Sequence, residues 1–222
     1  MIAGIGPITL LILAVTIFVS YRAMNDLDLK SKLLFNPYAF KHGKQYGRII
    51  THGLVHGSWL HLGINMFVLW SFGSSLEQIF VHGNAYAGYS GSFEGFGTLG
   101  HLAYLGLYTG GLIFATLPSV KKHGDSPNYN SLGASGAISA VILSFIIFNP
   151  MAELRLMFAI PIRAWLAAVL LFVYESYMDK RGKGNIAHDA HLWGAFFGVL
   201  FMILIDFDLL VECIRAIRNS IF

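Results

Sequence analysis

Long apolar runs constrain this chain more than any other feature of its sequence. A bilayer core of about 30 Å is crossed by about 20 apolar helical residues. Six such runs predict membrane-spanning helices at about residues 4–21, 59–80, 97–117, 133–148, 162–178 and 190–207. Only 12% of the residues are charged, against about 25% in soluble domains. We therefore expect an all-α, polytopic membrane protein in which residues 1–222 form a single six-transmembrane-helix bundle.

Charge and cysteine content exclude several other classes. The net charge is only +3, and no basic run is interleaved with aromatic residues, so nucleic acid is not an expected partner. Cys213 is the single cysteine, which rules out an intrachain disulfide. No Lys or Arg precedes the first run, which therefore reads as a retained helix rather than a signal peptide. The expected location is a membrane, the cell membrane if the source is bacterial.

Local signals predict where several helices begin and end. Ser58 is a plausible N-cap of the second span, whereas Pro118 should end the third and Asn149-Pro150 the fourth. The first loop, residues 22–57, is long enough to be functional or to contain structure of its own.

Two further segments lie outside the predicted spans. Residues 83–97, rich in glycine and aromatics, are expected to form a flexible turn. The tail at residues 209–222 could lie along the membrane interface.

The fourth run is short for a membrane span. The 14 residues from Ser135 to Phe148 give a helix about 21 Å long at 1.5 Å per residue. If one end reaches a membrane surface, Ser135 lies about 9 Å below the other surface. Non-helical backbone at that depth requires surrounding protein or a water-filled cavity, so we expect a cavity around Ser135.

Four polar side chains stand out within the apolar runs: His61, Asn65, Ser135 and His191. Such groups are costly in a membrane and usually mark functional sites. All four lie near the start of an even-numbered span. If every span crosses once, these starts share one membrane face, so the side chains should lie near one another at shallow depth.

These residue types suit acyl transfer. A serine within reach of a histidine provides a nucleophile and its general base. The oxyanion formed during attack needs hydrogen-bond donors. His61 and Asn65 share one helix face, and the Ser135 amide at a helix start is a third donor.

Glycines favour close approach of the serine and histidine helices. Gly133 and Gly136 flank Ser135, while Gly194 and Gly198 form a small-residue face near His191. Small faces of this kind pack membrane helices tightly.

Three segments resemble conserved motifs of the rhomboid family. They are HGLVHGSWLHLGIN (residues 52–65), GASG (133–136) and AHLWGAFFG (190–198), each at the opening of an even-numbered span. The order of the motifs and the six-span layout match over nearly the whole chain. The resemblance implies the rhomboid fold and an intramembrane serine endopeptidase that cleaves transmembrane protein substrates with a Ser-His dyad.

The resemblance also implies residue roles. Ser135 would be the nucleophile, His191 the base, and His61 and Asn65 the oxyanion donors. No cofactor is implied, and the partners are transmembrane substrates and the lipid bilayer.

One departure concerns the support of the histidine ring. Many family members have an aromatic residue four positions after the nucleophile, where this chain has Ser139. A hydroxyl contact from Ser139 is the expected replacement.

Metal binding is the main alternative for the remaining histidines. Two pairs have suitable spacing, His52 with His56 and His188 with His191. No cysteine is near, and Glu77 and Glu175 are remote in sequence, so we expect no metal. Glu77 and Asp206, near the far ends of their spans, should reach water. We expect His52 and His56 to hydrogen-bond the first loop and hold water near the site.

Asp189 invites a triad interpretation. It precedes His191 by two residues, which places its side chain on the other side of a helix. A capping role at the start of the sixth span is the better prediction.

Two other functions fit a polytopic protein. A helix-binding chaperone or pseudoprotease would typically lack the serine or the histidine, and this chain has both. A transporter would line the full membrane depth with polar residues, whereas residues 141–148 are almost wholly apolar.

Membrane orientation is where two arguments disagree. Loops one, three and five carry 11 of the Lys and Arg residues, against four on the opposite face. The positive-inside rule would therefore place these loops in the cytoplasm. The family resemblance implies the reverse, with the N-terminus inside, and we follow the family.

Overall fold

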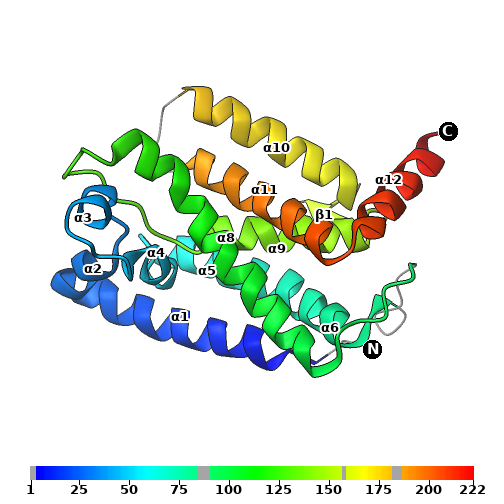
Figure 1. Cartoon of the computed structure of the whole chain (residues 1–222), viewed down its shortest axis with the longest axis horizontal. Helices are drawn as coiled ribbons and strands as arrows, with labels where there is room; N and C mark the ends of the chain where they lie inside the picture. Colours follow the sequence, from blue (N-terminus) through cyan, green and yellow to red (C-terminus); the bar gives the residue numbers. More distant parts are fainter. Residues whose placement is uncertain (1–3, 85–90, 157–158, 182–186) are drawn as a thin grey trace.

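A computed structural model describes residues 4–84, 91–156, 159–181 and 187–222. The described residues form a helical bundle with one short hairpin (Figure 1). The elements, in chain order, are α1 (Pro7–Asn25), α2 (Leu27–Leu33), α3 (Pro37–Lys41), α4 (Arg48–Thr51), η1 (His52–Leu54), α5 (Trp59–Val68), η2 (Leu69–Gly73), α6 (Ser74–His82), η3 (Gly97–Leu99), α8 (Gly100–His123), α9 (Ser135–Phe148), β1 (Glu153–Leu156), β2 (Ile160–Arg163), α10 (Ala164–Arg181), α11 (His188–Ile205) and α12 (Phe207–Ile221).

The helices that open with the candidate site residues run in the same direction. In Figure 1, α5, α9 and α11 all start toward the end of the bundle that carries α2, α3 and α4. The α1, α8 and α10 helices run the opposite way. The alternation agrees with the prediction from counting spans.

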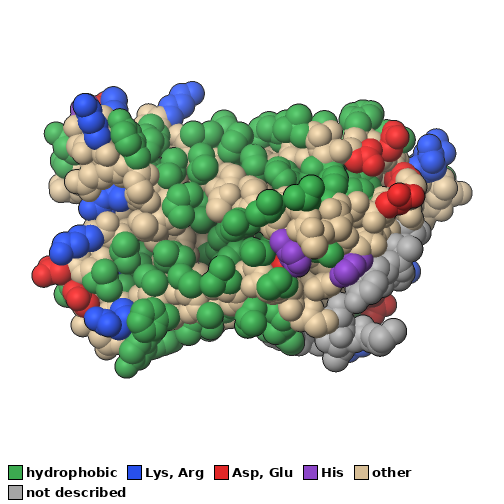
Figure 2. Space-filling model, turned by 60° about the horizontal axis from the view of Figure 1, so that its bottom comes forward, with side chains coloured by type: hydrophobic (Ala, Val, Ile, Leu, Met, Phe, Trp, Pro, Cys, Tyr) green, Lys and Arg blue, Asp and Glu red, His purple; other side chains and the backbone are tan. Residues whose placement is uncertain are grey.

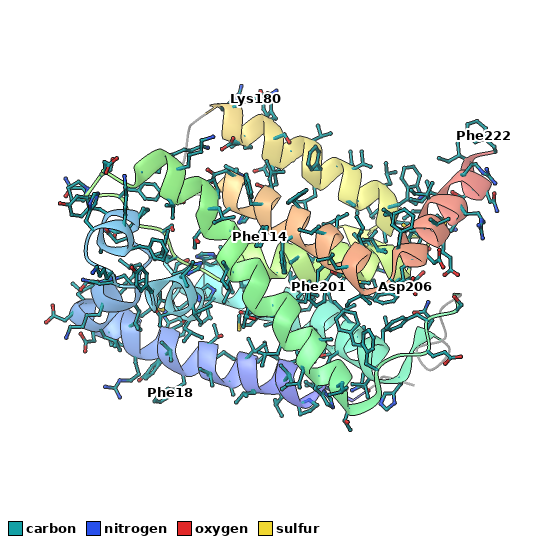
Figure 3. The ribbon with its side chains drawn as sticks, viewed as in Figure 1. Phe18, Phe114, Lys180, Phe201, Asp206 and Phe222 are labelled. Carbon is teal, nitrogen blue, oxygen red and sulfur yellow. The ribbon has the colours of Figure 1, made fainter. Side chains whose placement is uncertain are left out.

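The surface suits a lipid environment. Among the described residues, three helices are long and apolar enough to cross a membrane, namely α1, the segment Leu99–His123 and α11, while α9 is apolar but shorter. Figure 2 shows hydrophobic side chains across the middle of one face and charged side chains gathered toward its two ends. Phe18 on α1 is 62% exposed and points away from the bundle (Figure 3). The count of six spans remains a prediction.

The α9 helix is the central element of the core. Most of its residues are buried, and Ala137, Ala140 and Val141 are completely inaccessible. A helix apolar on all sides is stable only when others surround it. Ser135 is the first residue of this helix and is only partly buried, so the serine lies at the edge of the buried core.

The second predicted span contains a local irregularity. Ser58 caps α5 as predicted, its hydroxyl accepting from the His61 amide at 3.2 Å. A π-helical turn at Leu69–Gly73 then joins α5 to α6.

The predicted end of the third span at Pro118 is wrong. The α8 helix continues through Pro118 to His123. A proline removes one intrahelical hydrogen bond, but bundle packing can compensate for it. Pro118 is itself buried, and Lys121, Lys122 and His123 place positive charge at the negative end of the helix dipole.

The structure contains a small β-hairpin, which the all-α prediction did not include. The β1 and β2 strands pair antiparallel, with Leu154 opposite Ile162. The predicted fifth span, which starts at Ile162, therefore begins inside β2, and α10 starts at Ala164. Four-residue strands carry too little periodicity to be recognised beside a long apolar run.

The helix of the sixth predicted span ends two residues before the predicted end at residue 207. The α11 helix stops at Ile205, and Asp206 accepts from the Asp208 amide at 2.9 Å to cap α12. Figure 3 places Asp206 at this junction and Lys180 at the far end of α10.

The expectation that Glu77 reaches water is wrong. Its side chain is fully buried, and its carboxylate accepts from the Ile8 amide at 3.0 Å, the Thr9 amide at 2.8 Å and the Thr9 hydroxyl at 2.7 Å. His101 Nδ1 lies 2.7 Å from the same carboxylate. A negative charge at a helix N-terminus is stabilised by free amides and by the helix dipole, so Glu77 joins α6 to the start of α1.

The predicted turn at residues 83–97 falls partly outside the described residues, which omit 85–90. In the described part, the Asn84 amide donates to the Phe93 carbonyl at 2.8 Å. Phe93 and Phe96 contact the Phe80 ring. This part therefore packs onto α6.

Candidate active site

The backbone before α9 is shaped by glycine and anchored to the first loop. Gly133 has a φ of +110°, which a side chain would strain. Its amide donates to the His52 carbonyl at 2.9 Å, and Ser131 forms a bridge with Phe35. The first loop therefore sets the position from which α9 starts.

The α9 and α11 helices touch through their glycines. A Cβ added to Gly194 would lie 2.0 Å from the Gly136 carbonyl oxygen, and one at Gly198 would lie 2.5 Å from that of Ala140. The small face of Gly194 and Gly198 identified in the sequence thus packs against Gly136 and Ala140. Backbone-to-backbone contact brings the first turns of both helices together.

Ser135 and His191 meet at the start of this contact. The Ser135 hydroxyl lies 2.7 Å from His191 Nε2. The histidine side chain is 19% exposed, so the pair is recessed yet accessible. The predicted contact of Ser139 with this ring is wrong, because the Ser139 hydroxyl instead donates to the Ser135 carbonyl at 2.9 Å.

His61 lies next to the nucleophile. A Cβ on Gly133 would meet His61 Nε2 at 3.1 Å and the Ser135 hydroxyl at 4.0 Å, so the imidazole and the hydroxyl are adjacent across Gly133. The Gly57 amide approaches His61 Nδ1 at 3.5 Å. An amide can only donate, so this contact favours the tautomer with the ring proton on Nε2.

Asn65 lies one turn deeper on α5. It is buried, and its Nδ2 donates to the His61 carbonyl at 3.0 Å. An amide nitrogen has two protons, so one remains for a second acceptor.

His52 and His56 support the surrounding backbone. His52 Nδ1 lies 3.2 Å from the Arg48 carbonyl in the first loop, whereas His56 Nδ1 lies 2.9 Å from the Ser20 hydroxyl on α1. Burial lowers the pKa of His52 to about 4 and that of His56 to about 3. Both rings are therefore neutral near pH 7. Of the two, only His52 contacts the first loop as predicted.

Glu175 contacts the catalytic candidate His191, and the sequence analysis did not predict this contact. It reaches from α10 to α11, with Oε1 3.1 Å from His191 Nδ1 and Oε2 2.6 Å from His188 Nδ1. The three side chains lie within 4.8 Å of one another and could hold a metal ion. Glu175 is therefore distant from the two histidines in sequence but contacts them in the folded structure. The sequence signal that could have identified Glu175 is its ionisable side chain within an apolar run.

Asp189 faces away from the candidate pair, as predicted. Its carboxylate lies 2.7 Å from Lys122 Nζ and accepts from the Ala190 amide at 2.8 Å. It is not the N-cap, because α11 already begins at His188 with Ala187 as cap. The aspartate acts within the first turn, where negative charge is favoured.

Comparison with known proteins identifies the family. The family model of the Rhomboid domain matches residues 43–206, nearly three quarters of the chain and all of the candidate site. RHOMBOID-like protein 12, mitochondrial, from Arabidopsis thaliana is 31% identical over 185 residues, covering 81% of this chain and 52% of that protein.

Two further relatives come from yeast and zebrafish. Rhomboid protein 1, mitochondrial, from Saccharomyces cerevisiae is 33% identical, covering 69% of this chain and 40% of that protein. Presenilin-associated rhomboid-like protein A, mitochondrial, from Danio rerio is 31% identical, covering 69% and 36%. The chain thus spans about half or less of the length of these relatives. With the apolar helices and the matched domain, the chain belongs to the rhomboid family of integral membrane proteins.

Proposed function

We propose that this chain is an intramembrane serine endopeptidase with Ser135 as nucleophile and His191 as general base. The observation that carries the proposal is the 2.7 Å distance between the Ser135 hydroxyl and His191 Nε2. Such proximity lets the base take the hydroxyl proton as the oxygen attacks.

The first half-reaction forms an acyl-enzyme. Ser135 Oγ bonds to the carbonyl carbon of the scissile peptide while its proton passes to His191 Nε2. The carbonyl electron pair moves to the oxygen. When the C–N bond breaks, His191 returns the proton to the leaving amine.

The oxyanion would be held by three donors. His61 Nε2–H lies beside Ser135, Asn65 has a free amide proton, and the Ser135 amide opens α9. Among the described residues, no side chain caps this end of α9. Loss of one such donor costs roughly 10²–10³ in rate in a serine protease.

The second half-reaction hydrolyses the acyl-enzyme. His191 removes a proton from water, which attacks the ester carbon. The bond to Ser135 Oγ then breaks and the oxygen regains its proton. The steps need no cofactor.

The substrate is proposed to be a transmembrane protein segment. Ser135 is recessed in a bundle whose outer surface is apolar, so a substrate chain must unwind locally to reach it. Helix-destabilising residues near the cleavage site should therefore favour cleavage. Partner contacts are with such substrates and with lipid, and no nucleic acid is proposed.

The architecture is proposed to be one membrane domain with six spans. The mitochondrial names of the relatives favour a mitochondrial membrane over a cell membrane. The N-terminus is proposed to lie inside, with the site opening outward. A C-terminal reporter fused at Phe222 tests this orientation, and an outward-facing C-terminus would overturn it.

Contacts made by cations of the first loop reduce the weight of the opposing charge argument. Lys41 pairs with Asp125 at 2.9 Å. Arg48 donates to the Ser31 and Leu34 carbonyls, each at 2.7 Å. Folding thus occupies two of the cations counted by the positive-inside rule.

A fluorophosphonate probe tests the proposed activity. The detergent-purified protein is incubated with the probe, and the labelled residue is identified by mass spectrometry. We expect labelling at Ser135 that is lost in Ser135→Ala and His191→Ala. Absence of labelling in folded wild-type protein would contradict the activity and favour a non-cutting, helix-binding function.

A further inference from the structure

Glu175 has no part in the dyad described above, yet it is buried inside the bundle against the dyad histidine. Its side chain is 9% exposed, and the partner ring of His188 is 5% exposed. An ionised carboxylate so far from water needs strong compensation. The two imidazoles are the groups positioned to supply it, through contacts of 3.1 Å and 2.6 Å.

The contacts assign the protons. An ionised carboxylate only accepts hydrogen bonds, so Nδ1 of each histidine must donate. In a neutral imidazole the other nitrogen then carries the lone pair. For His191 that nitrogen is Nε2, the atom 2.7 Å from the Ser135 hydroxyl. Glu175 thus selects the tautomer that can accept the serine proton.

The surroundings favour this contact. A small cavity of about 40 Å³ adjoins the site, lined by Ser139, Glu175 and His191 together with apolar residues of α9, α10 and α11. The short Ser139 side chain leaves room beside the imidazole on the side from which Glu175 approaches. Apolar walls limit water, so the carboxylate and a protonated imidazole interact through a low local dielectric.

We infer that Glu175, held in place by His188, is a positioning residue that completes a Ser135–His191–Glu175 arrangement. The inference rests on the proposed serine endopeptidase function. Glu175 orients the His191 ring, fixes its tautomer and stabilises the imidazolium formed when Ser135 loses its proton. It does not itself take up the proton. Where the same geometry occurs in serine proteases, replacing the acid by its amide lowers kcat by about 10⁴.

The test measures fluorophosphonate labelling of the full-length protein over a range of probe concentrations. Saturation separates the maximal labelling rate, kinact, from the half-saturating concentration, KI. We expect Glu175→Gln to lower kinact by about 10²–10⁴ while leaving KI within about twofold. A change confined to KI, or kinact equal to wild type, would overturn the inference.

Charge and size are separated by a second substitution. Gln matches Glu in size but lacks its charge, whereas Asp keeps the charge on a shorter chain. We expect Glu175→Asp to label faster than Glu175→Gln. The reverse order would show that Glu175 acts only by filling space and would overturn the positioning role.

Asp179→Asn is the matched control. Asp179 lies one turn further along α10 and is 3.5 Å from Lys122 rather than near the site, so kinact should be unchanged. Should Glu175→Gln fail to fold, His188→Ala decides. It removes one bond to the carboxylate and should lower kinact by about tenfold, and an unchanged value would overturn the arrangement.

Two outcomes separate the inference from its alternatives. Absence of labelling in wild-type protein would overturn the proposed function and this inference with it, whereas normal labelling of Glu175→Gln would overturn the inference alone. Chelation with EDTA should leave wild-type kinact unchanged. Loss of labelling on chelation would show that Glu175, His188 and His191 hold a metal ion instead.

Discussion

The glycine contact between α9 and α11 gives a direct way to separate Ser135 from His191. The change is Gly194→Ala, which adds one methyl group. Its Cβ would lie 2.0 Å from the Gly136 carbonyl oxygen and 3.0 Å from the Gly136 Cα. Backbone cannot rotate away as a flexible side chain can, so the helices must move apart.

The size of the displacement follows from the contact distance. Real Cβ contacts essentially never fall below 3.0 Å, so the gap must widen by about 1 Å. Gly194 lies one turn from His191, and an equal shift there would lengthen the 2.7 Å contact with Ser135 beyond hydrogen-bond range. A misplacement of about 1 Å costs roughly 10²-fold in rate. Overpacking itself costs about 1–3 kcal/mol of stability.

Labelling and thermal unfolding measure the two effects separately. We expect Gly194→Ala to lower the fluorophosphonate labelling rate about 100-fold and to reduce the unfolding midpoint by a few degrees. Gly63→Ala is the matched control, because Gly63 also lies within a helix but has nothing within 4 Å of its added Cβ. Wild-type labelling and stability in Gly194→Ala would refute the close-packing argument.

Three further predictions concern other contacts. Glu77→Ala should lower the free energy of unfolding by about 2–4 kcal/mol, since it leaves buried donors of Thr9 and the α1 N-terminus without an acceptor; an unchanged thermal midpoint would contradict this. The low pKa of His52, about 4, means that the unfolded chain binds a proton that the folded chain does not. Stability should thus be full above about pH 6.5 and fall toward pH 4. A thermal midpoint independent of pH over this range, or a slope unaltered in His52→Phe, would oppose that account. Gly133→Ala should abolish labelling, because it strains a φ of +110° and drives a Cβ to 2.9 Å from His61 Cε1; normal labelling would show that the loop adapts.

Apolar length and polar placement made much of this protein predictable from its sequence. The predicted span at residues 133–148 ended correctly at Phe148, because Asn149-Pro150 stops a helix locally, while α9 starts two residues later than predicted, at Ser135. The adjacency of Ser135 and His191 was also predictable, because helix direction alternates between successive crossings and small residues mark the contact face.

Helix rotation and long-range packing were not predictable in this way. The approach of Glu175 to His191 depends on which side of α10 faces α11, and an apolar helix with little amphipathic pattern does not encode its own rotation. The expectation that Glu77 reaches water was wrong for the same reason. Its burial depends on contacts with the start of α1, 69 residues earlier in the chain, which the local sequence does not reveal. Pro118 is a helix-breaking signal in isolation that bundle packing overrides.

The sequence by itself determined the membrane class, the helix ends set by local chemistry, and the location of Ser135, His61 and His191 at one end of the helical bundle. Only the tertiary structure decided which buried carboxylate contacts which histidine. The physical reason is that chain direction and apolar length are local properties, whereas a hydrogen bond between helices depends on their rotation, depth and separation together.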